Sequence, residues 1–483
     1  MFKYFPHTAD DVRQMLDVIG VGSLEELYAE VPEELKYQGA LNIPSAMSEV
    51  EVRNAVRSLA ADNQPVEACY AGNGAYDHYQ PSVVPYIASR SEFSTSYTPY
   101  QAEISQGTLQ YIFEYQTMMA DLTGMDISNA SMYDGSTATA EAMMMCVANA
   151  KKRNKVLISA TFLPQVLDVV ATYAHYHGVE LIRVPEKDGV MDKQAAIALL
   201  EADDVAGLIC CQHNRYGLIE DFSGLADACH AHKALLAINS VAADLAILRT
   251  PGEWGADIAC GDAQSLGIPV GYGGPYIGYL CVKEALVRRM PGRLVGATTD
   301  VNGQRAFVLT LQAREQHIRR EKATSNICTA QGFMCLYVAA YLSLMGEKGL
   351  REAGQLSYAG AHYLHDALIK TNIFEEAYPG QLYTNEFTLR LKDGVLAPLF
   401  IDYMLQHGIL AGVAVAADQV TIAVTEKYTR EDLDRYLELV AEWPEERLFF
   451  PMTQADLDEY NKEIETMTEE AHGKCAGCSC ENA

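Results

Sequence analysis

The sequence lacks any apolar segment long enough to cross a membrane, and it is poor in basic residues. Its most apolar stretch, Cys335 to Met345, has 11 residues, whereas a spanning helix needs about 20. The first residues lack the basic region and apolar core of a secretory signal. Only 36 Lys and Arg oppose 64 Asp and Glu, a formal charge of −28. A surface this negative repels nucleic acid and anionic lipid, which excludes a mainly electrostatic grip on either.

Common catalytic signatures are missing too. The chain has no G-x-S-x-G nucleophile elbow and no H-E-x-x-H zinc motif. What it does have is 483 residues, 49% hydrophobic and 21% charged, which is the composition of a folded chain of several domains. Most of its 12 cysteines are scattered through apolar segments, as reduced core thiols are. We therefore expect a cytoplasmic location.

From residue 108 onward, short continuous apolar runs alternate with helical patterns. Strands are predicted at 156–158, 180–184, 206–211, 234–238, 256–260 and 277–282, with helices over 109–123, 137–153, 164–178, 192–202 and 222–232. Such alternation predicts an α/β fold whose mostly parallel sheet is covered on both faces. Before it, helices are predicted over 7–19 and 48–61, followed by a loop-like segment rich in Tyr, Gly, Pro and His.

The later part of the chain predicts a smaller α+β unit. It begins with long apolar helices over 324–344 and 356–369 and continues with a strand at 386–391. We expect four parts in all: a helical N-terminal arm with interface loops (1–107), a large α/β domain (108–323), a small C-terminal α+β domain (324–448) and an acidic Cys-containing tail (449–483).

Two loops lie where a doubly wound sheet binds ligands, at the carboxyl ends of its strands. The turn Asp134-Gly135-Ser136-Thr137 opens a predicted helix, and its free amides suit a phosphate. The same residues also make an ordinary helix N-cap. Gly261 to Pro275 is rich in glycine, which suits either close approach of a ligand or a tight crossover. It has neither G-x-G-x-x-G spacing nor a P-loop Lys.

Two other segments carry chemistry-bearing side chains. The run from Arg314 to Lys322 is densely basic and includes His317, Arg319 and Arg320, whose guanidinium groups suit carboxylate or phosphate ligands. Its alternative is a solvated helix face with internal ion pairs. The tail holds Cys475, Cys478 and Cys480, which with His472 could ligate a soft metal; its alternative is an unstructured accessory tail.

Five long strings of residues strongly resemble the glycine cleavage system P protein. They are residues 72–81, 90–107, 122–125, 129–138 and 314–329. The similarity covers roughly residues 1–448. The length is similar to subunit 1 of the split bacterial form, in which two chains replace the halves of one long protein. The resemblance implies the type I pyridoxal-phosphate-enzyme (aspartate aminotransferase-like) fold, with a seven-stranded sheet and a small C-terminal domain.

The resemblance also implies glycine decarboxylation with pyridoxal phosphate and transfer of the aminomethyl group to the lipoyl arm of H protein. Such an enzyme needs a Schiff-base Lys. Aligning the family's Gly-rich loop on Pro269 and Pro275 puts Gln264 at the Lys position, and Gln cannot form an imine. Asn239 stands where the family has an acidic partner for the pyridine nitrogen, and Asp244 is the alternative acid for that place. Leu163-Pro164 also departs from the family's His-Pro.

The resemblance therefore implies a degenerate cofactor site in this chain, including Asp134 to Thr137, and a cofactor held by subunit 2. The implied assembly is an α2β2 tetramer in which this chain shapes the partner's site and is inactive alone. Arg90, Tyr97, Tyr100 and Gln101 are the residues expected to shape that site, with a purely structural interface role as the alternative. His317, Arg319 and Arg320 are expected at the mouth of the site or against the acidic H protein.

Two other functions stay open from the sequence. The first is an autonomous pyridoxal-phosphate enzyme such as an amino-acid lyase, which would need the missing Lys. The second is a non-catalytic protein that has left the complex and responds to metal through its Cys tail.

Overall fold

The computed structural model describes residues 6–443 apart from 38, 151, 272 and 324. The chain divides into two compact units, Met1–Pro65 and Val66–Ala483. The predicted tail, with Cys475, Cys478, Cys480 and His472, lies outside the described residues. No helix in the described part is long and apolar enough to span a bilayer. The predicted division into four parts stays a proposal.

The first unit consists of short helices stabilised at their ends. They are α1 (Ala9–Ile19), η1 (Glu25–Tyr28), η2 (Glu33–Leu35) and α2 (Glu49–Ala61). Thr8 with Asp11 and Ser48 with Glu51 form capping boxes, in which each side chain bonds the other's backbone amide. No residue of α1 or α2 is buried. Local hydrogen bonds, rather than burial, therefore define both predicted helices.

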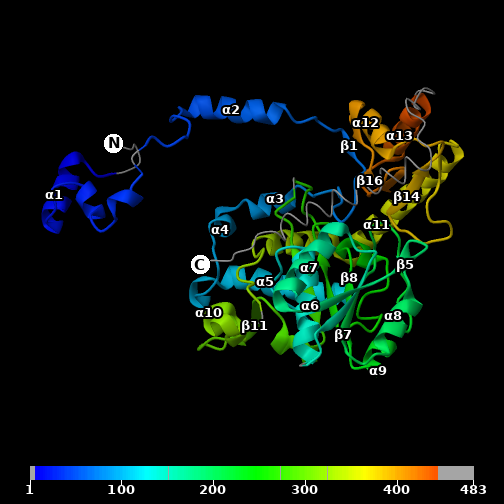
Figure 1. The fold of residues 1–483 in the computed structure, drawn as a ribbon, viewed down its shortest axis with the longest axis horizontal. Helices are drawn as coiled ribbons and strands as arrows, with labels where there is room; N and C mark the ends of the chain where they lie inside the picture. Colours follow the sequence, from blue (N-terminus) through cyan, green and yellow to red (C-terminus); the bar gives the residue numbers. More distant parts are fainter. Residues whose placement is uncertain (1–5, 38, 151, 272, 324, 444–483) are drawn as a thin grey trace. The chain divides into compact units, whose positions relative to one another are not determined.

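A seven-stranded sheet organises the second unit (Figure 1), in the order β2-β10-β9-β8-β7-β3-β4. Its strands are β2 (Ile127–Ser128), β3 (Lys155–Ser159), β4 (Glu180–Val184), β7 (Val205–Cys211), β8 (Leu235–Asn239), β9 (Ile258–Asp262) and β10 (Gly278–Val282). The run from β9 to β4 is parallel, and β10 is antiparallel to both neighbours. The predicted fold class is confirmed.

Burial on both faces explains the continuous apolar runs. Every residue of β7 is buried. Ile209 and Cys211 pack in one core with α6 (Gly135–Ala150) and α7 (Pro164–His177), whereas Leu208 and Cys210 pack in another with α8 (Lys193–Leu200) and α9 (Leu225–Ala231). Successive side chains point to opposite faces of a strand. Where helices cover both faces of the sheet, every side chain is buried, so the strand is apolar throughout and does not alternate between apolar and polar residues.

A third core joins the sheet to α5 (Gln106–Thr123) and to the first half of α11 (Met334–Lys370). Gly346, with φ 59° and ψ −177°, breaks α11 between the two helices predicted there. The first begins at Met334 rather than at 324. Ala330, at φ 52°, is left-handed, and side chains before it bond elsewhere: Ser325 donates to Glu141. Those contacts hold 325–333 as a loop.

The small C-terminal sheet has the order β13-β14-β17-β16, all antiparallel. Its elements are β13 (Phe374–Glu376), β14 (Glu386–Leu391), α12 (Ala397–Gln406), β16 (Val413–Ala416), β17 (Gln419–Ala423) and α13 (Arg430–Glu442). All of them except β16 contribute residues to one apolar core, which they share with the second half of α11. The predicted α+β character of this region agrees with these elements.

The Tyr-rich segment after residue 65 contains short elements rather than loops alone. They are β1 (Ala68–Cys69), which pairs with β15 (Ile409–Leu410), then α3 (Val83–Ala88), α4 (Ser91–Ser94) and η3 (Ala102–Ile104). Val84 and Ala88 are buried in the core shared by α5 and α11. The segment is therefore anchored at α3, whereas Tyr97 and Ile104 beyond it are exposed.

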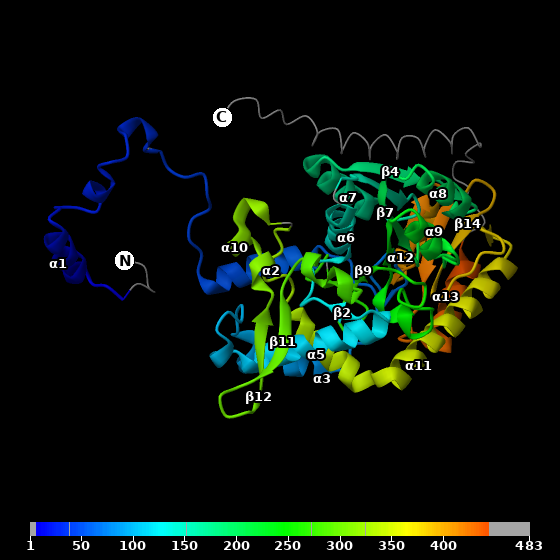
Figure 2. The ribbon, with the colours of Figure 1, turned by 90° about the horizontal axis from the view of Figure 1, so that it is seen from below.

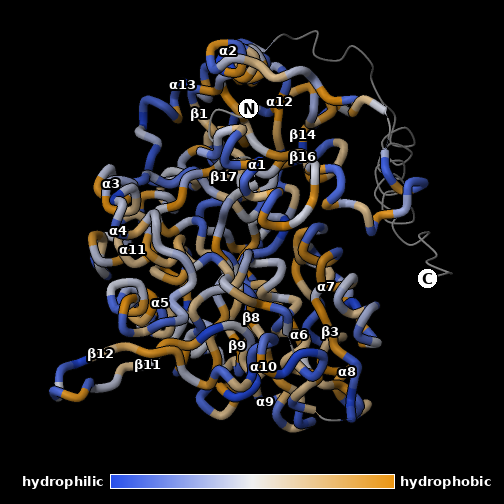
Figure 3. The backbone as a smooth tube through the Cα atoms, turned by 90° about the vertical axis from the view of Figure 1, so that its left-hand side faces the viewer, coloured by the Kyte–Doolittle hydropathy of each residue, from blue (hydrophilic) through white to orange (hydrophobic). Residues whose placement is uncertain are grey.

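An antiparallel hairpin, β11 (Leu294–Thr299) and β12 (Arg305–Thr310), was not predicted and projects from the second unit (Figures 2 and 3). The remaining elements are β5 (Glu186–Lys187), β6 (Val190–Met191), η4 (Ala242–Ala246), η5 (Glu284–Arg289), η6 (Gln312–Arg314), α10 (Gln316–Arg319) and η7 (Arg320–Lys322).

Candidate functional site

The turn before α6 is the place expected for a phosphate, and carboxyl groups of the chain itself bond its amides. Gly135 N–H donates to Asp262 Oδ2 at 3.0 Å, and Thr137 N–H donates to Asp134 Oδ1 at 2.7 Å. Burial raises the pKa of Asp262 to about 7. A phosphate here would meet two carboxyl groups in place of free amides, so this helix N-terminus does not fit one.

Gln264, at the position expected for Lys, is buried and fully hydrogen-bonded. Its Oε1 accepts from Tyr76 N–H at 2.9 Å, while Nε2 donates to Tyr76 O at 2.9 Å and to Ile268 O at 2.7 Å. The side chain is 1% exposed. It joins the loop at Tyr76 to the loop after β9, a structural task that uses every polar atom of the amide.

The end of β8 likewise offers no acid for a pyridine nitrogen. Asn239 Nδ2 donates to Thr139 Oγ1 at 2.9 Å. Asp244, the alternative acid, has its Oδ2 2.6 Å from His213 Nδ1. With Gln264 and Asp262 also committed to neighbouring groups, the described residues at this edge of the sheet do not fit pyridoxal phosphate.

A buried charged network lies beside this edge. His213 is between two carboxylates: Asp244 at Nδ1 and Glu386 at Nε2, the latter at 2.9 Å. Burial acts to lower the pKa of His213, but the two carboxylates outweigh it and raise the pKa to about 10. Tyr76 Oη and Asn73 N–H donate to the same Glu386 carboxylate. The network therefore joins the large sheet to the small one as an imidazolium between two carboxylates.

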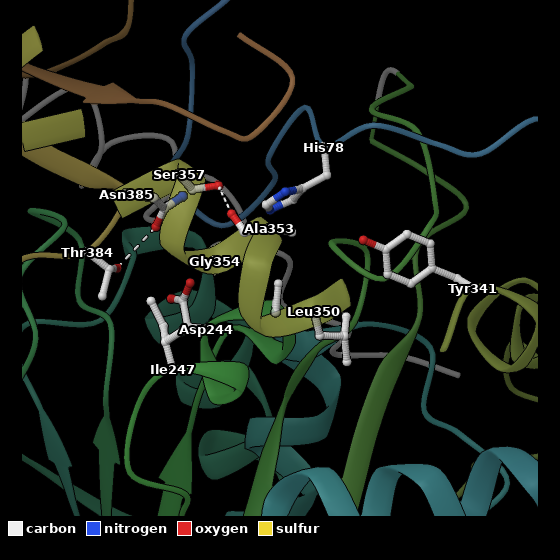
Figure 4. A pocket seen from close by; sticks show the side chains of 11 residues that line it. His78, Asp244, Ile247, Tyr341, Leu350, Ala353, Gly354, Ser357, Thr384 and Asn385 are labelled. Carbon is white, nitrogen blue, oxygen red and sulfur yellow. Dashed lines mark hydrogen bonds between the residues drawn. The ribbon is translucent and has the colours of Figure 1, made fainter. Parts of the chain in front are cut away.

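The pocket next to this network is small (Figure 4). Its cavity is about 20 Å³, lined by His78, Asp244, Ser357, Thr384 and Asn385 with apolar side chains of η4 and α11. A single water needs roughly 10–15 Å³. His78 is paired with Glu426, whose Oε2 lies 2.6 Å from His78 Nδ1. The space fits a water molecule and is too small for an amino acid.

A second set of polar side chains surrounds Arg293, and we call it the Arg293 cluster: Tyr100, Arg293, Glu315, His317 and Cys328. Arg293 Nη2 donates to Tyr100 Oη at 2.9 Å, and Arg293 Nε lies 3.6 Å from Glu315 Oε2. His317 Nδ1 lies 3.5 Å from the same carboxylate oxygen. Of the residues predicted from the sequence, the structure thus brings Tyr100 and His317 together, with ring centroids 6.1 Å apart.

The other predicted residues lie on the surface. Tyr97 is 85% exposed, and Arg90 pairs with its neighbour Glu92. Gln101 is exposed where η3 begins. Arg319 and Arg320 are exposed and make no side-chain ion pair with the residues that the structure describes. Their predicted roles toward a partner stay predictions.

One pocket adjoins the Arg293 cluster, and a second pocket lies next to the first. One, of about 320 Å³, is lined by Glu315, Gln316, His317, Arg320, Ile327 and Cys328. The other, of about 400 Å³, lies over α6 and α7 and shares Gln316 and Arg320 with the first. Glu141 lines it, and burial raises the pKa of that carboxyl to about 7. Within the described ranges, no group of three or more His, Cys, Asp or Glu residues is placed to hold a metal.

Sequence reasoning missed Arg293, Glu315, His213 and Glu386 as site residues. Nothing in the spacing connects Arg293 with Tyr100, which lies far away along the chain, because the contact depends on tertiary packing. Glu315 lay in the basic run but was considered only as an internal ion-pair partner. The one available signal was chemical: a single Arg directly after Met290-Pro291-Gly292, at the start of an apolar strand.

The fold is that of the type I pyridoxal-phosphate enzymes. Sphingosine-1-phosphate lyase of Burkholderia pseudomallei superposes with a TM-score of 0.64 over 93% of this chain and all of that one, at 13% identity. A crystal structure of glycine decarboxylase (P-protein) of the glycine cleavage system is much more similar, with a TM-score of 0.85 and 39% identity over 91% of this chain and 100% of that chain.

The family model of the glycine cleavage system P-protein matches residues 2–440. Probable glycine dehydrogenase (decarboxylating) subunit 1 of Carboxydothermus hydrogenoformans is 46% identical over 91% of this chain and 99% of its own length. The protein of the same name from Anoxybacillus flavithermus is 44% identical over 90% and 97%. The chain belongs to the glycine cleavage system P-protein family, as its resemblance predicted.

Proposed function

We propose that this chain is subunit 1 of glycine dehydrogenase (decarboxylating) and that it supports catalysis in a second subunit. Subunit 2 holds pyridoxal phosphate, and together the two chains decarboxylate glycine and pass the aminomethyl group to the lipoyl arm of H protein. The chain is inactive alone, and the assembly is an α2β2 tetramer. The names of the similar proteins from Carboxydothermus and Anoxybacillus support the subunit assignment.

The observation that carries the division of labour is the closed edge of the sheet. Gln264 cannot form an imine, and its three hydrogen bonds hold it in place. Asp262 and Asp134 bond the amides that a phosphate would need. A protein of this family that cannot hold the cofactor needs another chain to do so.

The surface around Tyr97 supports a contribution to that other chain. Tyr97, Tyr100 and Ile104 are all more than half exposed, and exposed apolar side chains that recur along one segment are typical of a protein interface. We propose that Arg90, Tyr97, Tyr100 and Gln101 shape the site of subunit 2, and that His317, Arg319 and Arg320 lie at its mouth or contact H protein. The exposed guanidinium groups suit an acidic partner.

Reconstitution tests this function. The chain, subunit 2 and their mixture are each given pyridoxal phosphate, reduced with borohydride, and assayed for exchange of glycine carboxyl with labelled bicarbonate. We expect borohydride to fix the cofactor to subunit 2 alone, and exchange to be strong only in the mixture. Cofactor fixed to this chain, with exchange by this chain alone, would favour an autonomous enzyme. An inert mixture with a competent subunit 2 would favour a departed relative.

A further inference from the structure

Arg293 is a buried cation at the start of the projecting hairpin. Its side chain is 5% exposed, and it directly precedes β11. Arginine is rarely buried unless it is paired, so its partners show what the burial achieves.

Those partners come from three separate segments. Arg293 Nη2 donates to Tyr100 Oη at 2.9 Å and contacts Cys328 Sγ at 3.5 Å, and the guanidinium lies over the Tyr100 ring at 5.0 Å. Arg293 Nε faces Glu315 Oε2 at 3.6 Å. A planar guanidinium can serve several partners at once with fixed angles between them, which an ammonium cannot.

Further bonds tie the same segments together. Thr98 Oγ1 lies 2.7 Å from Thr329 Oγ1, so the Tyr100 loop and the Cys328 loop meet a second time. Arg314 donates to the carbonyls of Met290 and Gly292, which fixes the backbone just before Arg293. Arg293 is thus the centre of a convergence of three loops.

The cluster forms the wall of an open pocket. Glu315, His317 and Cys328 line the cavity of about 320 Å³, and Tyr100 is 52% exposed beside it. Glu315 Oε1 is buried, and the described residues give it no hydrogen-bond partner. The wall therefore has a buried carboxylate, whose Oε2 lies within ion-pair distance of Arg293 and His317.

We propose that Arg293 is a positioning residue, whose guanidinium holds Tyr100, Glu315 and Cys328 in the arrangement that this chain presents to the active site of subunit 2. This role rests on the proposed function: the surface that this chain offers to subunit 2 depends on Arg293. Arg293 acts through Tyr100 and touches no reacting atom.

The test uses the complex of the full chain with subunit 2 and the glycine–bicarbonate exchange assay. Arg293→Met should lower kcat at least about tenfold, with a much smaller change in KM for glycine and with the complex still formed. Arg293→Lys keeps the charge but not the planar geometry, so it should recover only part of the loss. Arg288→Met, a matched change at an exposed arginine of η5, should leave kcat unchanged.

A double-variant cycle separates positioning from general damage. Tyr100→Phe removes the hydroxyl that Arg293 bonds and should lower kcat less than Arg293→Met does. The two changes together should lose no more than Arg293→Met alone, because they break the same contact. Losses that multiply, or an Arg293→Met complex within about twofold of the Arg288→Met control, would overturn the proposal. If Arg293→Met does not fold, an unchanged kcat in Tyr100→Phe overturns it.

Alkylation of Cys328 in the chain alone tests the contact between Arg293 and Cys328 without subunit 2. Burial acts to raise the pKa of this thiol, but the Arg293 charge and hydrogen bond outweigh it and leave the pKa below its usual value. Arg293→Met should therefore move the pH midpoint of Cys328 alkylation upward. Mass spectrometry of the peptide that contains Cys328 measures the alkylation. An unmoved midpoint would refute the contact. Failure of the wild-type chain to activate subunit 2 would refute the proposed function instead.

Discussion

Nε2 of His213 and Oε2 of Glu386 lie 2.9 Å apart in a contact that joins the large sheet to the small one, with both side chains no more than 2% exposed. Asp244 holds the other ring nitrogen. Since each ring nitrogen faces a carboxylate, the ring is an imidazolium, and the whole group is one buried ionic unit.

Stability should fall with rising pH because of His213. Its pKa is raised from 6.5 to about 10, so the folded chain binds the proton more tightly than the unfolded chain. The stabilisation is complete below about pH 6.5 and is lost as the pH rises through 10. Urea unfolding should show wild type losing up to about 1 kcal/mol per pH unit between pH 7 and 9 relative to His213→Gln. Equal slopes for the two proteins would contradict this.

Gln264→Leu should destabilise the chain by about 2–4 kcal/mol. The change keeps much of the volume but leaves Tyr76 N–H, Tyr76 O and Ile268 O without the bonds they have now. Urea midpoints measure it. Gln304→Leu, at an exposed position of the projecting hairpin, is the control and should change stability by less than about 0.5 kcal/mol. A loss no larger than the control's would mean that Gln264 is dispensable.

Glu141→Gln should stabilise the chain above pH 7. Burial raises the pKa of Glu141 from 4.5 to about 7, so ionising it costs the folded state as the pH rises through that window. The Gln oxygen can still accept the Ser325 hydroxyl, which lies 2.6 Å from Glu141 Oε1. We expect a gain of about 2–3 kcal/mol at pH 8 and little change at pH 4.5. Thermal or urea unfolding at both values checks it; a loss at pH 8 would argue that the carboxylate serves a ligand or partner.

Gly346→Ala should destabilise α11. Its φ of 59° and ψ of −177° belong to a region that only Gly adopts readily, and a Cβ there costs about 1–3 kcal/mol whatever the space around it. Gly107→Ala is the matched control, because Gly107 lies in α5 with nothing within 4 Å of an added Cβ and should gain a few tenths of a kcal/mol. Equal effects would show that the break in α11 is not imposed at Gly346.

Tyr97→Ser should separate function from stability. The ring is 85% exposed in this chain, so the unfolding free energy should change by less than about 0.5 kcal/mol. Exchange by the complex with subunit 2 should fall severalfold if the ring lies against the partner's site. Tyr176→Ser, on the equally exposed α7 surface, is the comparison. Identical exchange rates in the two variants would remove Tyr97 from the proposed interface.

The sheet and its helices were predictable because their apolar patterns are local and strong. Val205–Cys211 shows the limit of such patterns: the run predicts a strand, but not which neighbours it pairs. The hairpin at 294–310 was missed although its turn contains Asn302-Gly303, a recognised hairpin signal. Its two strands pair only with each other, so they do not belong to the alternation of strands and helices that predicts the large sheet. α11 was predicted as two helices, since the pattern weakens around Gly346.

Site residues were predictable only in the segments that resemble the family or align with it. Gln264 could be placed by alignment. Its hydrogen bonds to Tyr76 could not be predicted, because the two residues lie far apart in the sequence and neither segment has a pattern that indicates the contact. Tyr100 and His317 were both predicted, whereas Arg293, which donates a hydrogen bond to Tyr100, was not. Long-range polar contacts follow from the packing of loops, which leaves no periodic trace in sequence.

The bond between Gly135 N–H and the Asp262 carboxyl group also bears on how the amount of this chain should depend on cofactor supply. A protein that binds its cofactor gains folding free energy that grows with the logarithm of the cofactor concentration. This chain supplies its own carboxyl groups at the equivalent place. Under the function proposed above, its abundance should therefore not follow the supply of pyridoxal phosphate, whereas that of the proposed cofactor-holding subunit should. When the cofactor is scarce, we therefore expect this chain to be in excess over the proposed subunit 2, ready to assemble when the supply returns.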